Sequence, residues 1–101
     1  MIKHIVIWKL KEEASGGSRT ENALKMKQML EALTAKVPGI VSLEVGLKTD
    51  KAPANNDDVI LVSEFASWHD LDVYATHPEH LKVVDFVKSV VERRAVVDYE
   101  L

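Results

Sequence analysis

The chain has 101 residues, 47% apolar and 29% charged, which suits one compact domain and excludes a two-domain organisation. Thirteen Lys and Arg against sixteen Asp and Glu give a formal charge of -3, without the basic surface that nucleic-acid binding requires. The sequence has no cysteine, which excludes disulfide frameworks, thiolate nucleophiles and thiolate metal sites. We therefore expect a single cytoplasmic domain that binds no nucleic acid.

A first strand is predicted over residues 2–10, because Ile, Val and Trp dominate this segment and both alternating faces are apolar. Lysines at positions 3, 9 and 11 interrupt the apolar run, so we expect neither an export signal nor a membrane-spanning helix. The two faces carry different residues: His4, Val6 and Trp8 on one, and Ile5 and Ile7 on the other.

A helix is predicted to begin after Ser18, because Ser18 and Glu21 have the S-x-x-E spacing of a capping box. Pro38 disfavours helical geometry at the residue before it, so the helix should end near Val37. Its apolar residues recur at steps of three and four and predict one buried face: Leu24, Met26, Met29, Leu30, Leu33 and Val37.

Two more strands follow, at residues 40–47 and 59–65, separated by a polar loop at 48–56. Ser67 is the predicted N-cap of a short helix that ends before Pro78. Pro78 favours a first helical position, so a longer helix should begin there and continue to residue 91. Residues 94–101 form the predicted last strand.

This order of elements predicts a ferredoxin-like α+β fold, a four-stranded antiparallel sheet with its helices on one face. The opposite face would remain uncovered, yet alternation places a set of large apolar residues on it: Ile5, Ile7, Ile60, Val62, Val97 and Tyr99. Apolar surfaces of that size seldom stay exposed to water. We therefore expect a symmetric homodimer in which two sheets pack face to face through this uncovered face.

The candidate chemistry lies in one cluster, His77-Pro78-Glu79-His80, with Tyr74 one turn upstream. His80 would be the third residue of the helix, where the helix dipole disfavours the imidazolium, and a neutral imidazole can accept a proton. His77 is extended before Pro78 and is better placed to cap the helix. No third ligand is fixed by spacing beside the two histidines, and no phosphate-binding loop is present. We therefore expect neither a metal nor a cofactor.

Three other polar residues each allow two interpretations. Tyr74 can offer its hydroxyl to an oxyanion, or it can be a core tyrosine. His4 is either part of the polar end of a cavity or a satisfied core residue. Asp98 can accept a hydrogen bond from a histidine and fix its tautomer, or it can be a solvated carboxylate at the end of a strand.

Several segments in this order and spacing resemble the stress-responsive dimeric A/B barrel domain family, often called Dabb. They are Met1–Val6, Val37–Ile40, Phe65 with the short helix to Tyr74, His77-Pro78-x-His80 and Val97–Tyr99, and together they span essentially the whole chain. The resemblance implies a ferredoxin-like protomer and a homodimeric α+β barrel.

A plant polyketide cyclase of that family performs an aldol-type ring closure without cofactor or metal. The resemblance implies that His80 matches its general base and Tyr74 its assisting tyrosine. His4 and Asp98 match the early strand histidine and the late strand aspartate of its site. The chain departs from the cyclase in the predicted pocket, where Met26 and Met29 occupy the first helix, so the same substrate is not implied.

Three functions follow as expectations. In the first, a small apolar carbonyl compound loses a proton to His80, and Tyr74 stabilises the enolate. The predicted substrate pocket has an apolar wall of Val6, Trp8, Leu61, Phe65 and Leu81. The second is a non-catalytic, stress-associated dimer with a binding or structural role, and the third is a cofactor-independent barrel of the monooxygenase type. A cavity faced by His80 and Tyr74 favours an enzyme, whereas a filled core with His80 bonded only to the backbone favours a structural role.

Overall fold

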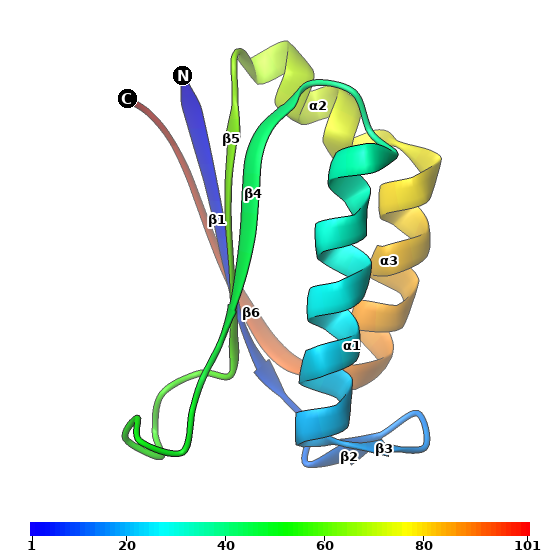
Figure 1. Ribbon diagram of the computed structural model, residues 1–101, viewed down its shortest axis with the longest axis vertical. Coiled ribbons are helices and arrows are strands. Elements are labelled where there is room, and N and C mark those ends of the chain that lie inside the picture. The colour runs from blue at the N-terminus through cyan, green and yellow to red at the C-terminus, as the bar shows by residue number, and fades with distance from the viewer.

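The computed structural model describes residues 1–101 and has a layer of helices packed on one face of a sheet (Figure 1). The antiparallel sheet has the order β4-β5-β1-β6. Its strands are β1 (Ile2–Leu10), β4 (Ile40–Leu47), β5 (Val59–Phe65) and β6 (Val91–Glu100). The helices are α1 (Arg19–Glu31), α2 (Trp68–Thr76) and α3 (Pro78–Val90). This arrangement confirms the predicted ferredoxin-like α+β fold.

The capping box at the start of α1 is present as predicted. The Ser18 hydroxyl accepts from the Glu21 backbone N–H at 3.2 Å, and the Glu21 carboxylate accepts from the Ser18 N–H at 3.1 Å. The helix ends at Glu31 and continues as the 3-10 helix η1 (Ala32–Ala35), earlier than predicted. Leu24 was expected on the buried face, but it is 50% exposed. The buried stripe follows Met26 and Leu30 at a step of four, and Leu24 is two residues off that stripe.

A small hairpin of β2 (Glu13–Ala14) and β3 (Gly17–Ser18) precedes α1 and was not predicted. Its turn places Gly16 at φ 78°, a conformation that glycine adopts readily. The buried Asn22 amide donates to the carbonyls of Ala14, at 2.9 Å, and Gly17. The hairpin is therefore fastened to the first turn of α1.

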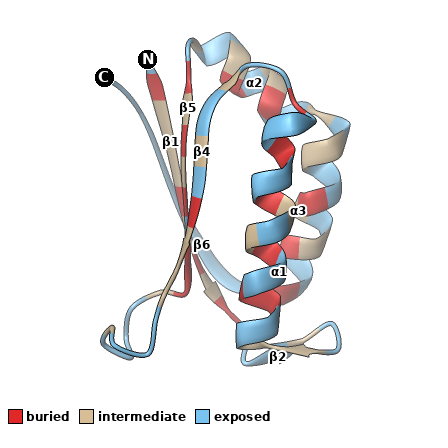
Figure 2. Cartoon of the chain, viewed as in Figure 1, coloured by how far each residue is buried: buried red, intermediate tan, exposed pale blue.

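The core lies between the helices and the sheet, and the buried segments in Figure 2 face this interface. Val6 and Trp8 of β1 are buried there, on the face predicted to be covered. In β4 the register shifts between Ile40 and Ser42, and Val41, at this irregularity, is 54% exposed. No helix is long and apolar enough to span a bilayer.

The other face of the sheet has no helix over it (Figure 1). Residues opposite one another in the antiparallel register share a face, and Ile5 pairs with both Val62 and Val97. Through the same register the open face comprises Ile5, Ile7, Ile60, Val62, Ala95, Val97 and Tyr99. Val97 is 61% exposed within the single chain. The apolar residues expected on this face are therefore all on it.

Candidate functional site

An apolar cavity of about 310 Å³ lies between the sheet and the helices. It is within the lower range of small-molecule sites, and its walls include Val6, Trp8 and Leu61, as predicted from the sequence. Its polar lining groups include His4, Tyr74 and His80. The fold therefore brings three of the four predicted catalytic residues, from β1, α2 and α3, to one cavity.

The His80 ring is held by the end of the preceding helix. Its Nδ1 donates to the Ala75 carbonyl oxygen at 3.0 Å, and this carbonyl is one of those that the last turn of α2 leaves without a helical partner. A carbonyl oxygen only accepts, so the proton must be on Nδ1. In the neutral ring Nε2 then keeps its lone pair and can accept a proton.

The environment of His80 favours the neutral ring. Burial lowers its pKa, and the nearby His4, Arg94 and His77 lower it further, while the hydrogen bond to Ala75 opposes the shift. The ring also lies at the first turn of α3, where the helix dipole disfavours positive charge. At neutral pH His80 is therefore an uncharged base.

Tyr74 is buried against His80, with their ring centroids 4.3 Å apart. Burial raises the pKa of the Tyr74 phenol to about 12, so the hydroxyl stays protonated at neutral pH. That hydroxyl is buried and has no hydrogen-bond partner in the protein. A buried donor without a partner costs ~1–3 kcal/mol, so a ligand oxygen that accepts from it would recover this loss.

His4 and Asp98 form a second polar pair. They are opposite each other in the β1–β6 register, and His4 Nδ1 donates to the Asp98 carboxylate. The bond fixes the tautomer of His4, as the sequence allowed, and leaves its Nε2 free in the neutral ring. The His4 ring lies edge-on to Tyr74, with centroids 6.1 Å apart. Asp98 therefore orients His4 and does not itself line the cavity.

His77 has the capping role expected from the sequence. Its Nδ1 accepts from the Glu79 backbone N–H at 3.1 Å, as the N-cap of α3, with Pro78 in the first turn. No three His, Asp or Glu side chains gather in an arrangement that could hold a metal ion.

Two residues of the predicted apolar wall do not line the cavity. Leu81 is 48% exposed, because it lies next to His80 on α3 and a one-residue step turns it toward solvent. Phe65 is fully buried, but it packs behind Tyr74, with ring centroids 5.2 Å apart, and supports that ring.

Among the lining residues that were not predicted from the sequence are Val84 and Lys88 on α3 and Arg94 on β6. Val84 and Lys88 follow His80 at steps of four, the spacing of one helix face, and this pattern could have identified them. Arg94 lies opposite Trp8 in the sheet, on the same face, which required the strand register.

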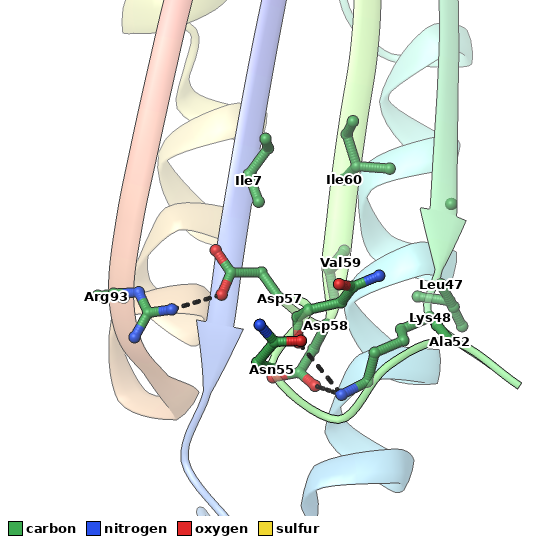
Figure 3. Close-up of a pocket in the computed structure, with 12 residues that line it drawn as sticks. Ile7, Leu47, Lys48, Ala52, Asn55, Asp57, Asp58, Val59, Ile60 and Arg93 are labelled. Atoms are coloured by element: carbon green, nitrogen blue, oxygen red, sulfur yellow. Dashed lines mark hydrogen bonds and ion pairs between the residues drawn. The ribbon is translucent and has the colours of Figure 1, made fainter. Parts of the chain in front are cut away.

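A larger, shallower hollow of about 580 Å³ lies at the loop end of the open sheet face (Figure 3). Ile7 and Ile60 border it, and the ion pair between Arg93 and Asp57, at 2.6 Å, lies at its edge. It contains no histidine or tyrosine, and it continues the open apolar face. This hollow therefore lacks the acid–base groups of the cavity under the helices.

Two kinds of comparison relate the chain to known proteins. The family model described as the Stress responsive A/B Barrel Domain, Dabb, matches residues 2–101. A dimeric protein of unknown function and ferredoxin-like fold from Bacteroides fragilis is 38% identical, with a TM-score of 0.83 over 99% of this chain and 95% of that one. Among curated proteins no match is found.

Two similar structures have named activities. The hydroxynitrile lyase from Passiflora edulis is 22% identical, with a TM-score of 0.78 over 99% of this chain and 92% of that one. An antibiotic biosynthesis monooxygenase is 17% identical, with a TM-score of 0.76 over 100% and 98%. Both show likeness of fold alone. The family model covers nearly the whole chain, and the protein therefore belongs to the Dabb, or stress-responsive A/B barrel domain, family.

Proposed function

We propose that the protein binds a small apolar carbonyl compound under its helices and removes a proton from the carbon beside the carbonyl, with His80 as the base. One observation carries this proposal. In a single apolar cavity, a half-buried neutral imidazole lies against a buried, protonated tyrosine whose hydroxyl has no partner. This pair supplies the base and the hydrogen-bond donor that enolate formation requires.

In the proposed step the C–H bond next to the carbonyl breaks and its proton moves to Nε2 of His80. The electron pair moves onto the carbonyl oxygen, and the resulting enolate accepts a hydrogen bond from the Tyr74 hydroxyl. Because the Ala75 carbonyl holds Nδ1, the ring presents Nε2 without reorganising. A positioned base contributes typically ~10²–10⁴-fold to the rate. Cyclisation, isomerisation or decarboxylation would follow according to the substrate.

Two further groups complete the polar part of the site. His4, oriented by Asp98, is positioned beside Tyr74 and can exchange a proton or a hydrogen bond with a ligand oxygen. The indole N–H of Trp8 is also buried without a partner, and Trp8 lines the cavity. His4 can orient a carbonyl group or a second polar group of the ligand, and a ligand acceptor that reached the indole N–H would give it the partner that it lacks.

The active form in this proposal is a homodimer that joins the open sheet faces. The uncovered aliphatic surface supports it, as does the dimeric relative from Bacteroides fragilis. Charged residues surround the apolar centre, with Lys3 opposite Glu64 and Arg93 paired with Asp57, which suits the polar rim of an interface.

One observation favours the non-catalytic alternative: the only hydrogen bond of the His80 side chain is to a backbone carbonyl. A test must therefore separate binding from proton transfer. Phenylacetone, a neutral aryl ketone, is the probe, and its benzylic protons are followed by NMR as they exchange with D₂O. The variants are His80→Gln, Tyr74→Phe and, as a matched control, His69→Gln, which alters an exposed histidine of α2.

We expect the wild-type protein and His69→Gln to accelerate exchange ~10²–10⁴-fold over buffer. His80→Gln should return exchange to the buffer rate. Tyr74→Phe should lower it ~10²-fold and leave folding stability unchanged or raised, because the variant removes a buried hydroxyl that has no partner. Saturable binding of phenylacetone without exchange in the wild type would reject the catalytic role and favour the binding protein.

A further inference from the structure

Two cationic side chains line the cavity under the helices. Lys88 comes from α3 and Arg94 from β6, and both residues are exposed, so they form the solvent-facing part of the lining. Neither takes part in any ion pair of the protein. Two unpaired cations at one apolar cavity are free to bind an anion.

The backbones of the two cationic residues lie toward the opposite end of the cavity from that of His80, while the charge of Arg94 still acts on the His80 ring. His80, Val84 and Lys88 follow one helix face at steps of four, so the backbones of His80 and Lys88 are ~12 Å apart along the axis. The sheet has the same order, since His4 pairs with Asp98 and Trp8 pairs with Arg94. The cavity thus has a His4–Tyr74–His80 end, an apolar middle and a cationic end.

No acidic residue lines the cavity to balance these charges. Asp98, the acidic group nearest to the lining histidines, already accepts the hydrogen bond from His4. Lys88 and Arg94 are the permanently charged residues of the lining. An anionic group at this end would therefore gain two favourable interactions and meet no carboxylate of the lining.

We propose that the substrate is a carbonyl compound with a carboxylate at its far end, the carbonyl lying at Tyr74 and the carboxylate between Lys88 and Arg94. This inference rests on the proposed function and names its substrate class. The guanidinium of Arg94 matches the planar carboxylate with two parallel hydrogen bonds, and Lys88 supplies a second charge. The apolar middle, at Val6 and Val84, accommodates an aryl or alkyl spacer.

The test compares two probes that differ only in charge, 4-(2-oxopropyl)benzoate and 4-(2-oxopropyl)benzamide, with each Kd measured by NMR titration. The variant Lys88→Gln/Arg94→Gln removes both cations of the cavity. The control Lys36→Gln/Lys82→Gln removes the same net charge. Lys36 and Lys82 are exposed and lie outside both the cavity and the open sheet face.

We expect the wild type and the control to bind the benzoate about tenfold more tightly than the benzamide, a preference that 0.5 M salt reduces. In Lys88→Gln/Arg94→Gln the two probes should bind equally, with the affinity for the benzamide unchanged.

Equal binding of both probes by the wild type would overturn the inference and would leave the proposed carbonyl site at Tyr74 and His80 unaffected. An equal loss of the preference for the benzoate in both double variants would overturn it too, because the preference would then come from the net charge of the protein and not from the two cations of the cavity. If neither probe binds, the inference is wrong, whereas phenylacetone exchange decides separately on His80.

Discussion

At the scale of single residues, the tautomer of the His80 ring depends on an atom outside its own helix. The Ala75 carbonyl takes the Nδ1 proton, and the Tyr74 ring covers one side of the imidazole. These two contacts convert a half-buried histidine into a base with a defined tautomer. The Tyr74 hydroxyl, unlike the His80 ring, has no hydrogen-bond partner in the protein. It therefore lowers the stability of the native state and leaves a donor for a ligand.

The lowered pKa of His80 predicts how stability depends on pH. The native state prefers the neutral ring, so the unfolded chain binds a proton at a higher pH than the native protein does. The contribution of His80 is therefore complete above the usual histidine value of 6.5 and is lost as the pH falls below it. We expect the free energy of unfolding of the wild type, relative to His80→Gln, to decrease from pH 7 to pH 5.

Urea denaturation at each pH measures this difference, with His69→Gln as the control, whose profile should parallel the wild type. A difference between wild type and His80→Gln that stays constant with pH would contradict the neutral native form.

At the scale of elements, the junction between α2 and α3 builds the site. His77 caps α3, Pro78 sets the first turn, and the orphan carbonyl of Ala75 at the end of α2 receives His80. Only His77 separates α2 from α3, and this short junction brings Tyr74 and His80 into contact from two different helices. Local capping thus determines the position of the base.

Removal of this cap should weaken the helix and displace the base together. We expect His77→Ala to lower the free energy of unfolding by ~1 kcal/mol, because the Glu79 N–H loses its acceptor. His77→Asn, which supplies another capping oxygen, should retain most of that stability. Urea denaturation measures both variants, and the NMR shifts of His80 report the ring position. If His77→Ala is as stable as His77→Asn, the imidazole has no capping role.

At the scale of the whole molecule, the open sheet face is the largest feature that a single chain leaves unexplained. Its aliphatic centre is continuous across β5, β1 and β6, and no element covers it (Figure 2). Burial of such a face against a second copy would remove it from water and leave the cavity on the other side of the sheet. The proposed dimer therefore stabilises the sheet that positions His4 without blocking the site.

Substitutions at two neighbouring valines of β6 distinguish loss of this interface from general effects on folding. Val97 lies on the open face opposite Ile5, whereas Val96 lies on the helix side opposite Val6, and both are exposed in the single chain. We expect Val97→Glu to weaken dimerisation ~100-fold or more, because it buries an unpaired charge. Val96→Glu should leave the dimer intact. Sedimentation velocity measures the assembly and circular dichroism the fold; a dimeric Val97→Glu would place the interface elsewhere.

The sequence was sufficient to predict the order of the four main strands and three helices, the caps at Ser18, Ser67 and His77, and the separation of the two faces of the sheet. These features depend on residues near in the chain, through hydrogen bonds of the first helical turn and the alternation of strands. It also allowed, as one of two interpretations, that Asp98 accepts a hydrogen bond from a histidine, and the structure shows that this histidine is His4.

The tertiary structure was needed for the remaining details of the cavity. It directed Leu81 to solvent, placed Phe65 behind Tyr74, and added Arg94 to the lining. It also left the Tyr74 hydroxyl without a partner and fixed the tautomer of His80. The physical reason is that an enclosed volume and its unpaired donors depend on how α2 and α3 are placed over the sheet, and this placement is determined by packing among residues far apart in the chain.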